Sequence, residues 1–333
     1  MSPLSLSLAC WDYDRCRAIL DGTVGIPGVD LKTTTAPPGA LFPLAVTDAP
    51  YDITEMSSSS YLMQLASGES AYLAIPVFVS RAFRHDGVYV RTDRGIEQPK
   101  DLEGRVVGVP EYQMTMALWA RGLLSDEYAV DFRTFKYRTG GTNKTGRIER
   151  LPLKLPENID IQPIDEQRTL NELLLDGELD AIIAPEPPLA FQQGNPIIAR
   201  LIDDPSSAER AYYAKTGLFP IMHMIGIRKT LIEAHPGLAS DLHRAFVEAR
   251  RLTMDDLRAT AVASANRMHL PWFSAEWEAT VSLMGAEFWP YGVAENRKDL
   301  QTLCRYSHEQ YLTPRCLDVK ELFAPEALEL GGI

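Results

Sequence analysis

Short apolar runs alternate with amphipathic segments along the first two thirds of the chain, and this alternation predicts strands and helices in turn. Apolar runs rich in β-branched residues predict strands at 4–10, 29–35, 51–56, 73–79, 88–91, 105–109, 132–137, 159–164, 179–184 and 219–228. Helical periodicity predicts helices at 15–21, 39–46, 61–66 and 169–175, with another after residue 114. Alternating elements of this kind favour an α/β fold with a mostly parallel sheet.

The final third of the chain is helical. Three amphipathic segments, at 238–263, 275–284 and 299–311, are separated by proline-containing breaks. The segment 95–101 resembles a crossing into a second lobe, and the apolar run at 219–228 returns the chain to the first. We therefore expect lobe I at 1–91 and 220–333, lobe II at 92–219, and a ligand cleft between the lobes.

Charge and composition narrow the choice of partners. The chain has 333 residues, 45% of them hydrophobic, a net charge of −12 and a pI near 5.1. The negative electrostatic field of such a chain repels phosphate backbones and anionic lipid. We therefore expect neither nucleic acid nor a membrane as a partner. The four cysteines have no CxxC spacing, and residues 1–14 lack the basic and apolar parts of an export signal. We expect a cytoplasmic protein, and the long C-terminal helices are compatible with a homo-oligomer.

One strand-to-helix turn has the pattern of half a ligand site. In PKDLEGRVVGVPEYQMT, residues 99–115, an apolar strand runs through Pro110 into a helix. The turn is expected to expose Glu111, Tyr112, Gln113 and Thr115. Ligands of open α/β sheets lie beyond the carboxyl ends of strands, where helix-start N–H groups attract anions. An ordinary buried turn is the alternative.

Other polar residues stand at similar strand ends. Arg81, Arg84 and His85 form a cationic turn, and the serine run 57–60 precedes a helix. The favoured interpretation of the serine run is a helix N-cap together with loop residues. The alternative is that its hydroxyl and N–H groups bind a carboxylate. Glu186 follows the strand at 179–184. His223 lies within an apolar strand, a position more typical of a core histidine than of a catalyst.

Several motif classes are absent from the sequence. It contains no HExxH, GxSxG, GxGxxG or complete Walker loop, which weakens the metalloprotease, hydrolase and nucleotide-binding hypotheses. GTNKTG, at 141–146, lacks the GK[ST] ending of a phosphate-binding loop. No metal motif occurs, although a divalent metal site could assemble from His85, His223, Glu111 and Glu186. The remaining polar set suits an aromatic or carboxylated ligand.

The chain resembles the 4,5-dihydroxyphthalate decarboxylase family over nearly its whole length. The resemblance rests on LACWDYDRCRAILDG, EMSSSSYL, SRAFRHDGVYVRT, DLEGRVVGVPEYQMTMALWARGLL, YRTGG, DAIIAPEPP and FPIMHMIGIR. It implies an α/β, two-lobe type II periplasmic-binding-protein-like fold with a helical C-terminal region. At the position of Glu186 the family pattern is often basic, whereas this chain has an acidic residue.

The resemblance implies non-oxidative loss of CO2 from a dihydroxylated aromatic acid, in phthalate degradation. No organic cofactor is required, because a hydroxyl para to the leaving carboxylate supplies the electrons. We expect His85 or His223 to act as general acid, with Glu111 or the other histidine assisting phenol deprotonation. Arg84 and Arg81 would hold the retained carboxylate. The remaining expected substrate contacts are Trp11, by ring stacking, and Ser58, Ser59, Gln113, Thr115 and Glu186.

Two other functions fit the same fold. A solute-binding protein for a small carboxylate would capture the ligand without chemistry. A lyase similar to chorismate dehydratase would also bind a carboxylated ring, but its acid–base groups would act differently. Release of CO2, release of water, or binding alone distinguishes the three functions.

Overall fold

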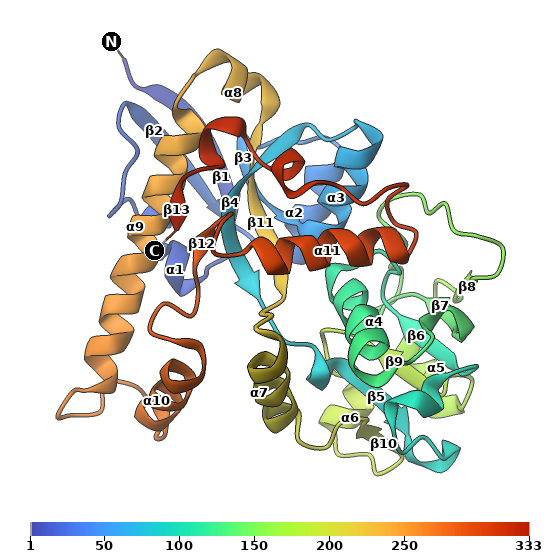
Figure 1. Cartoon of the computed structure of the whole chain (residues 1–333). Coiled ribbons are helices and arrows are strands. Elements are labelled where there is room, and N and C mark those ends of the chain that lie inside the picture. The colour runs from blue at the N-terminus through green and yellow to red at the C-terminus, as the bar shows by residue number, and fades with distance from the viewer. Residues whose placement is uncertain (1, 333) are drawn as a thin grey trace. The chain divides into compact units, whose positions relative to one another are not determined.

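The structure, a computed structural model, describes residues 2–332 and divides the chain into two compact units (Figure 1). Unit 1 comprises the residues up to Arg81, Ile221–Gln301, and those from Leu317 onward. Unit 2 comprises Ala82–Pro220 and Thr302–Cys316. The chain thus leaves unit 1 at Arg81, ahead of the crossing expected at 95–101. Residues 302–316, which the sequence pattern assigns to lobe I, belong to unit 2.

Unit 1 is built on a five-stranded mixed sheet with the order β2-β1-β3-β11-β4. Its strands are β1 (Leu4–Cys10), β2 (Val29–Thr35), β3 (Ile53–Ser57), β4 (Tyr72–Arg81) and β11 (Ile221–Arg228). β1 pairs in parallel with β2 and β3, whereas β11 runs antiparallel to both β3 and β4. A strand from late in the chain therefore lies between two strands from the N-terminal segment.

Helices pack around this sheet. They are α1 (Asp14–Leu20), α2 (Pro38–Val46), α3 (Ser58–Ser67), α8 (Lys229–Ala234), α9 (Leu238–Ala261) and α10 (Phe273–Met284). The long helix α9 contacts α1 and β4 through one apolar face (Figure 1). β12 (Tyr291–Gly292) pairs with β13 (Gly331–Gly332). α11 (Arg297–Glu309) begins in unit 1 and ends among the residues of unit 2.

Unit 2 contains a six-stranded mixed sheet with the order β10-β5-β9-β6-β7-β8. Its strands are β5 (Val88–Arg91), β6 (Val106–Val109), β7 (Lys136–Thr139), β8 (Asp160–Pro163), β9 (Ala181–Ile183) and β10 (Ile198–Arg200). β6 is parallel to β7 and β9, whereas β5 is antiparallel to β9 and β10. The helices are α4 (Thr115–Tyr128), α5 (Leu170–Asp176), α6 (Leu189–Gln192) and α7 (Pro205–Thr216).

The C-terminal segment of unit 2 packs directly on α4. A Cβ added at Gly122 would lie 2.2 Å from the ring of Tyr306, so only glycine permits this approach. Arg121 is fully buried on the same helix and donates to the side-chain oxygen of Gln310 at 2.7 Å. Residues 302–316 are therefore part of the core of unit 2, despite their distance from it in sequence.

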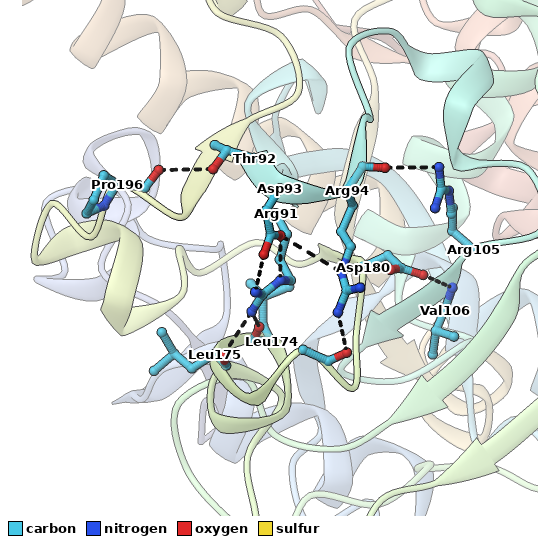
Figure 2. A network of polar contacts seen from close by, with 11 residues as sticks. Arg91, Thr92, Asp93, Arg94, Arg105, Val106, Leu174, Leu175, Asp180 and Pro196 are labelled. Carbon is cyan, nitrogen blue, oxygen red and sulfur yellow. Dashed lines mark hydrogen bonds and ion pairs between the residues drawn. The ribbon is translucent and has the colours of Figure 1, made fainter.

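The end of α5 is held by two arginines, one at the end of β5 and one in the turn that follows (Figure 2). Arg91 donates to the carbonyl oxygens of Leu174 and Leu175 at 2.6 and 2.9 Å, and Arg94 donates to that of Gly177 at 2.8 Å. The last carbonyls of a helix lack partners within the helix and carry partial negative charge, which cations stabilise. These arginines serve the fold of unit 2.

The predicted elements agree well with the observed ones up to β9, with some shifts. The predicted strand 132–137 is a 3-10 turn at Phe132–Thr134 followed by β7, because two of its apolar residues fill the core below the turn. The sequence pattern missed α6, β10 and α7. α7 nevertheless has a clear start signal, since Asp204 caps the N–H of Ser207 and Pro205 occupies the first turn. Among residues 2–332, no helix has the length and apolar character needed to cross a membrane.

Candidate functional site

A buried glutamate is the centre of a polar cluster in unit 1. Glu55 lies on β3, whose five residues are all buried, so its carboxylate needs partners. One carboxylate oxygen, Oε1, accepts from the hydroxyl of Tyr13 at 2.7 Å and contacts Nδ1 of His223 at 2.7 Å. The other, Oε2, accepts from the backbone N–H of Trp11 at 2.9 Å. The strand order creates this cluster, because β3 lies between β1 and β11.

The electrostatics of the cluster keep Glu55 ionised. Burial raises its pKa, but hydrogen bonding and charge from His223, together with the donors on Trp11 and Tyr13, bring that pKa below its ordinary value. Burial and the charge of Glu55 raise the pKa of the Tyr13 hydroxyl far above its ordinary value. Tyr13 is therefore a hydrogen-bond donor, and Nδ1 of His223 carries the proton that it shares with Glu55.

The two ring nitrogens of His223 have different surroundings: Nδ1 contacts Glu55, and Nε2 is the nitrogen that can exchange a proton with another group. Its ring packs edge-on against Phe42, with 4.7 Å between ring centroids, and its Nδ1 faces Glu55. The side chain is 17% exposed. Since the carboxylate fixes Nδ1, proton transfer to an external group has to use Nε2.

Trp11 is an exposed aromatic residue beside this cluster. The side chain follows β1, is 45% exposed, and meets the ring of Tyr13 edge-on at 5.7 Å between centroids. Behind Tyr13, the guanidinium of Arg15 lies 4.6 Å from the Tyr13 ring and 4.0 Å from the Trp289 ring. The Arg15 guanidinium therefore lies against the rings of both Tyr13 and Trp289, in two cation–π contacts.

The serine run lies at the junction of β3 and α3, next to this cluster. Ser57 ends β3 and pairs in register with His223, while Ser58 and Ser59 begin the ten-residue helix α3 and are fully buried. The Ser58 hydroxyl has no hydrogen-bond partner among the described residues. The N-terminus of α3 therefore begins beside the position of His223 on β11.

Arg81 is committed to contacts within unit 1. Its buried guanidinium donates to the side-chain oxygen of Asn296 and to the carbonyl of Pro290, and it lies 3.6 Å from Asp299. These contacts attach the segment before α11 to the end of β4. The structure thus gives Arg81 an anchoring role within unit 1, whereas Arg84 and His85 belong to unit 2.

The turn between β6 and α4 is buried, so the expectation that it exposes four side chains is wrong. Glu111, Tyr112, Gln113 and Thr115 are each at most 3% exposed. The loop after β7 covers the turn. Arg147 donates to Oε1 of Glu111 through Nε and Nη2, at 2.9 and 2.6 Å, and Arg150 donates to the same oxygen at 2.9 Å.

A second glutamate from that loop occupies the N–H groups of the turn. Glu149 accepts from the backbone N–H groups of Tyr112 and Gln113. With its oxygen oriented toward the loop, the Gln113 amide accepts from the N–H groups of Arg150 and Leu151 at 2.9 and 2.6 Å. Burial, assisted by the charge of Glu111, raises the pKa of Glu149 to about 7. The anion position expected at this turn is thus filled from within the chain.

The remaining predicted residues lie elsewhere in unit 2. His85 is 2% exposed, packs against Tyr212, and burial lowers its pKa to about 4. Burial lowers the pKa of the neighbouring Arg84 to about 10, although the charges of Asp86 and Glu209 oppose this shift. Glu186 is exposed between β9 and α6. Within residues 2–332, no three or more His, Cys, Asp or Glu side chains are grouped to hold a metal ion, including the four considered above.

Five residues of these clusters were not identified from the sequence. They are Tyr13, Glu55, Arg147, Glu149 and Arg150. A signal existed for Glu55, because a lone carboxylate within the apolar strand ITEMS must be buried with a partner. For the loop residues the sequence offered only a basic, glycine-rich stretch without periodicity.

Comparison with known proteins adds a close relationship over the full length. The chain is 43% identical over 329 residues to a 4,5-dihydroxyphthalate decarboxylase of Comamonas testosteroni, an alignment covering 99% of both chains. It is also 43% identical over 213 residues to a 4,5-dihydroxyphthalate decarboxylase of Pseudomonas putida, covering 64% of this chain and 83% of that one. No protein-family model matches the chain.

Among solved structures, the chain is similar to a periplasmic sulfonate-binding protein of Methylobacillus flagellatus. The TM-score is 0.56 at 12% sequence identity, and the alignment covers 98% of this chain and 93% of the other. At this identity the similarity concerns the fold alone. The two mixed α/β sheets therefore form the two lobes of a type II periplasmic-binding-protein-like fold, as the sequence predicts.

Proposed function

Because the chain belongs to the 4,5-dihydroxyphthalate decarboxylase family, we propose that it converts 4,5-dihydroxyphthalate to 3,4-dihydroxybenzoate and CO2. The identity to a decarboxylase along almost the entire chain is the observation that carries this proposal. The reaction replaces one ring carboxylate by hydrogen, consumes one proton and involves no net oxidation.

The substrate itself provides the electrons for the reaction. Each carboxylate is para to a hydroxyl, so a phenolate can push electron density to the carbon that bears the leaving carboxylate. Protonation at that carbon interrupts the aromatic ring. Cleavage of the carbon–carboxylate bond then returns its electron pair to the ring and releases CO2. The protein has to deliver one proton to a specific carbon and stabilise the phenolate.

We assign proton delivery to Nε2 of His223. Its Nδ1 is held by the ionised Glu55, and Tyr13 fixes the orientation of Glu55. A buried carboxylate that orients a histidine is a recurring arrangement in enzymes that transfer protons through the opposite nitrogen. This arrangement supports His223 over the alternative histidine.

His85 lacks the features of a general acid. With a pKa lowered to about 4 by burial, roughly one molecule in a thousand carries the imidazolium at neutral pH. Glu111 likewise does not suit phenol deprotonation, because one oxygen already accepts from Arg147 and Arg150. We therefore assign Glu111 to holding these arginines and not to the phenol.

Binding groups for the substrate lie beside His223. Trp11 offers an exposed indole for stacking on the ring, and the N-terminus of α3 offers N–H groups and the Ser58 hydroxyl for a carboxylate. Trp11 adjoins the Glu55 cluster through its ring contact with Tyr13. The N-terminus of α3 adjoins it through Ser57, which pairs with His223.

The decisive experiment is an assay of the purified protein with 4,5-dihydroxyphthalate, following CO2 release and 3,4-dihydroxybenzoate by mass spectrometry. We expect stoichiometric formation of both. Phthalate, which lacks the hydroxyls, is the control and should not react. Binding of the dihydroxy acid without CO2 release would favour a solute-binding protein, and loss of water from chorismate would favour the other lyase.

A further inference from the structure

The strand pairing beside His223 is irregular. In the sheet of unit 1, His223 on β11 is paired with Ser80 on β4. The next pair along the two strands, Ile225 with Ile75, leaves one β11 residue opposite four β4 residues, 76–79. We call the segment 76–79 the β4 bulge. Bulges change the direction of neighbouring side chains and are frequent beside active sites.

Two side chains from outside the strand bind carbonyl groups of the β4 bulge. Nε of Arg15 donates to the carbonyl oxygen of Val79 at 2.8 Å, and the indole N–H of Trp289 donates to that of Phe78 at 2.8 Å. The Arg15 guanidinium also lies 4.0 Å from the centre of the Trp289 ring. Arg15 and Trp289 therefore bind adjacent carbonyls of the bulge and contact each other.

The same guanidinium contacts the ring that carries the Tyr13 hydroxyl, at 4.6 Å from the ring centre. This hydroxyl donates to Oε1 of Glu55 at 2.7 Å and lies 3.2 Å from Nδ1 of His223. A hydrogen bond from Ser80, the residue paired with His223, also reaches it. Arg15 is thus connected to the Glu55–His223 pair through a single side chain, that of Tyr13.

Arg15 is held more firmly than its neighbour on the same helix. Its side chain is 17% exposed, and Nη1 donates to the carboxylate of Asp14 at 2.9 Å in addition to the contacts above. The side chain of Arg17 is 61% exposed and pairs with Asp12. A planar guanidinium that lies on aromatic rings restricts their movement through cation–π attraction.

We infer that Arg15 is a positioning residue of the Glu55 cluster: it joins the β4 bulge to the Tyr13 ring and thereby keeps the Tyr13 hydroxyl on Glu55. Oε1 of Glu55 accepts from Tyr13 and also contacts Nδ1 of His223, so displacement of Tyr13 would release the carboxylate that fixes the histidine. The inference rests on the proposed function only where it concerns turnover.

Nuclear magnetic resonance of the protein without substrate tests the positioning directly. In wild type with isotope-labelled histidine, the Nδ1–H proton of His223 should give a slowly exchanging signal, identified by its loss in His223→Gln. We expect Arg15→Gln and Tyr13→Phe to broaden this signal or abolish it, because Nδ1 loses its fixed partner. Arg17→Gln is the matched control on the same helix and should leave the signal unchanged.

A double-mutant cycle separates positioning from a general loss of stability. We expect Arg15→Gln and Tyr13→Phe each to lower kcat roughly 10-fold, with KM within about twofold of wild type. If Arg15 acts through the Tyr13 hydroxyl, the double variant should also lose roughly 10-fold, whereas independent effects would multiply to roughly 100-fold. Arg15→Lys keeps the charge without the planar group, and its loss of kcat should be intermediate.

The melting temperature, measured for each variant, identifies those that fold. If Arg15→Gln does not fold, the Nδ1–H signal of Arg15→Lys decides in its place. A signal identical to that of wild type would overturn the inference, as would a double variant whose losses multiply. Failure of the wild type to release CO2 from 4,5-dihydroxyphthalate would instead contradict the proposed function alone, because the Nδ1–H signal reports the positioning without substrate.

Discussion

Units 1 and 2 each contain a buried glutamate, Glu55 within β3 and Glu111 just after β6, and the two glutamates have different kinds of partner. Glu55 holds a histidine and a tyrosine, whereas Glu111 holds two arginines. A histidine can gain or lose a proton near neutral pH, but a guanidinium stays charged. The comparison teaches that a carboxylate's chemical role follows from its partner. The same residue type orients the proposed proton donor in unit 1 and pairs with permanently charged arginines in unit 2.

The largest effect should come from the proton donor itself. We expect His223→Gln to lower kcat by roughly 10²- to 10⁴-fold, because the variant lacks the proposed proton donor. The assay is steady-state CO2 release, with the melting temperature measured in parallel. His235→Gln, which changes a histidine elsewhere in unit 1, is the control. A kcat near wild type in His223→Gln would remove the proton-transfer role from unit 1.

Matched substitutions at the two glutamates should separate their roles. Glu55→Gln should lower kcat roughly 100-fold, since His223 loses the carboxylate that fixes its Nδ1. Glu111→Gln should instead lower the free energy of unfolding by roughly 2 kcal/mol, with kcat within about threefold of wild type. Chemical denaturation and steady-state kinetics on both variants give the comparison. A larger loss of kcat in Glu111→Gln would reverse the assignment.

Glu149 should make the stability of unit 2 depend on pH. Its folded-state pKa of about 7 lies above the ordinary value of 4.5, so between these pH values the unfolded chain ionises first. The stabilisation from the protonated group is complete below pH 4.5 and is lost as pH rises toward 7. Relative to Glu149→Gln, we expect the wild type to lose about 2 kcal/mol of unfolding free energy across that range.

Denaturation series at pH 4.5, 5.5, 6.5 and 7.5 would measure this difference. Glu166→Gln, a change on the neighbouring loop, serves as the control and should parallel the wild type. A constant offset between wild type and Glu149→Gln at every pH would show that Glu149 has an ordinary pKa.

The smallest effect should be that of the other histidine. His85→Gln should leave kcat within about threefold of wild type at pH 7, because burial already keeps the imidazole neutral there. Steady-state kinetics of His85→Gln, measured in parallel with those of His223→Gln, test this prediction. If both variants lose activity to a similar extent, the proton donor is not confined to unit 1.

The sequence predicts the fold far better than it predicts the partners of polar side chains. Strands such as β1 and β6 follow from local apolar patterns, and the resemblance to a decarboxylase family supplied the architecture. The pairing of Glu55 with His223 joins residues 168 positions apart, so no local pattern contains it. The turn at Glu111 was expected to be exposed, but a loop without periodicity folds over it. The position of Trp11 directly after a strand could be predicted from the sequence, because the apolar pattern of β1 ends at the residue before it.

The antiparallel position of β11 has a consequence for how the protein is made. This strand completes the unit 1 sheet between β3 and β4, yet the ribosome synthesises it only after all of Ala82–Pro220. At about 5–20 residues per second, the first 81 residues wait many seconds with two unpaired strand edges. Unit 2 is not complete at that point either, because residues 302–316, which pack on α4, are synthesised later still. Because His223 lies on β11, the proposed proton donor meets Glu55 only when this strand joins the sheet. A chain truncated before residue 221 therefore lacks both the complete sheet and the Glu55–His223 pair.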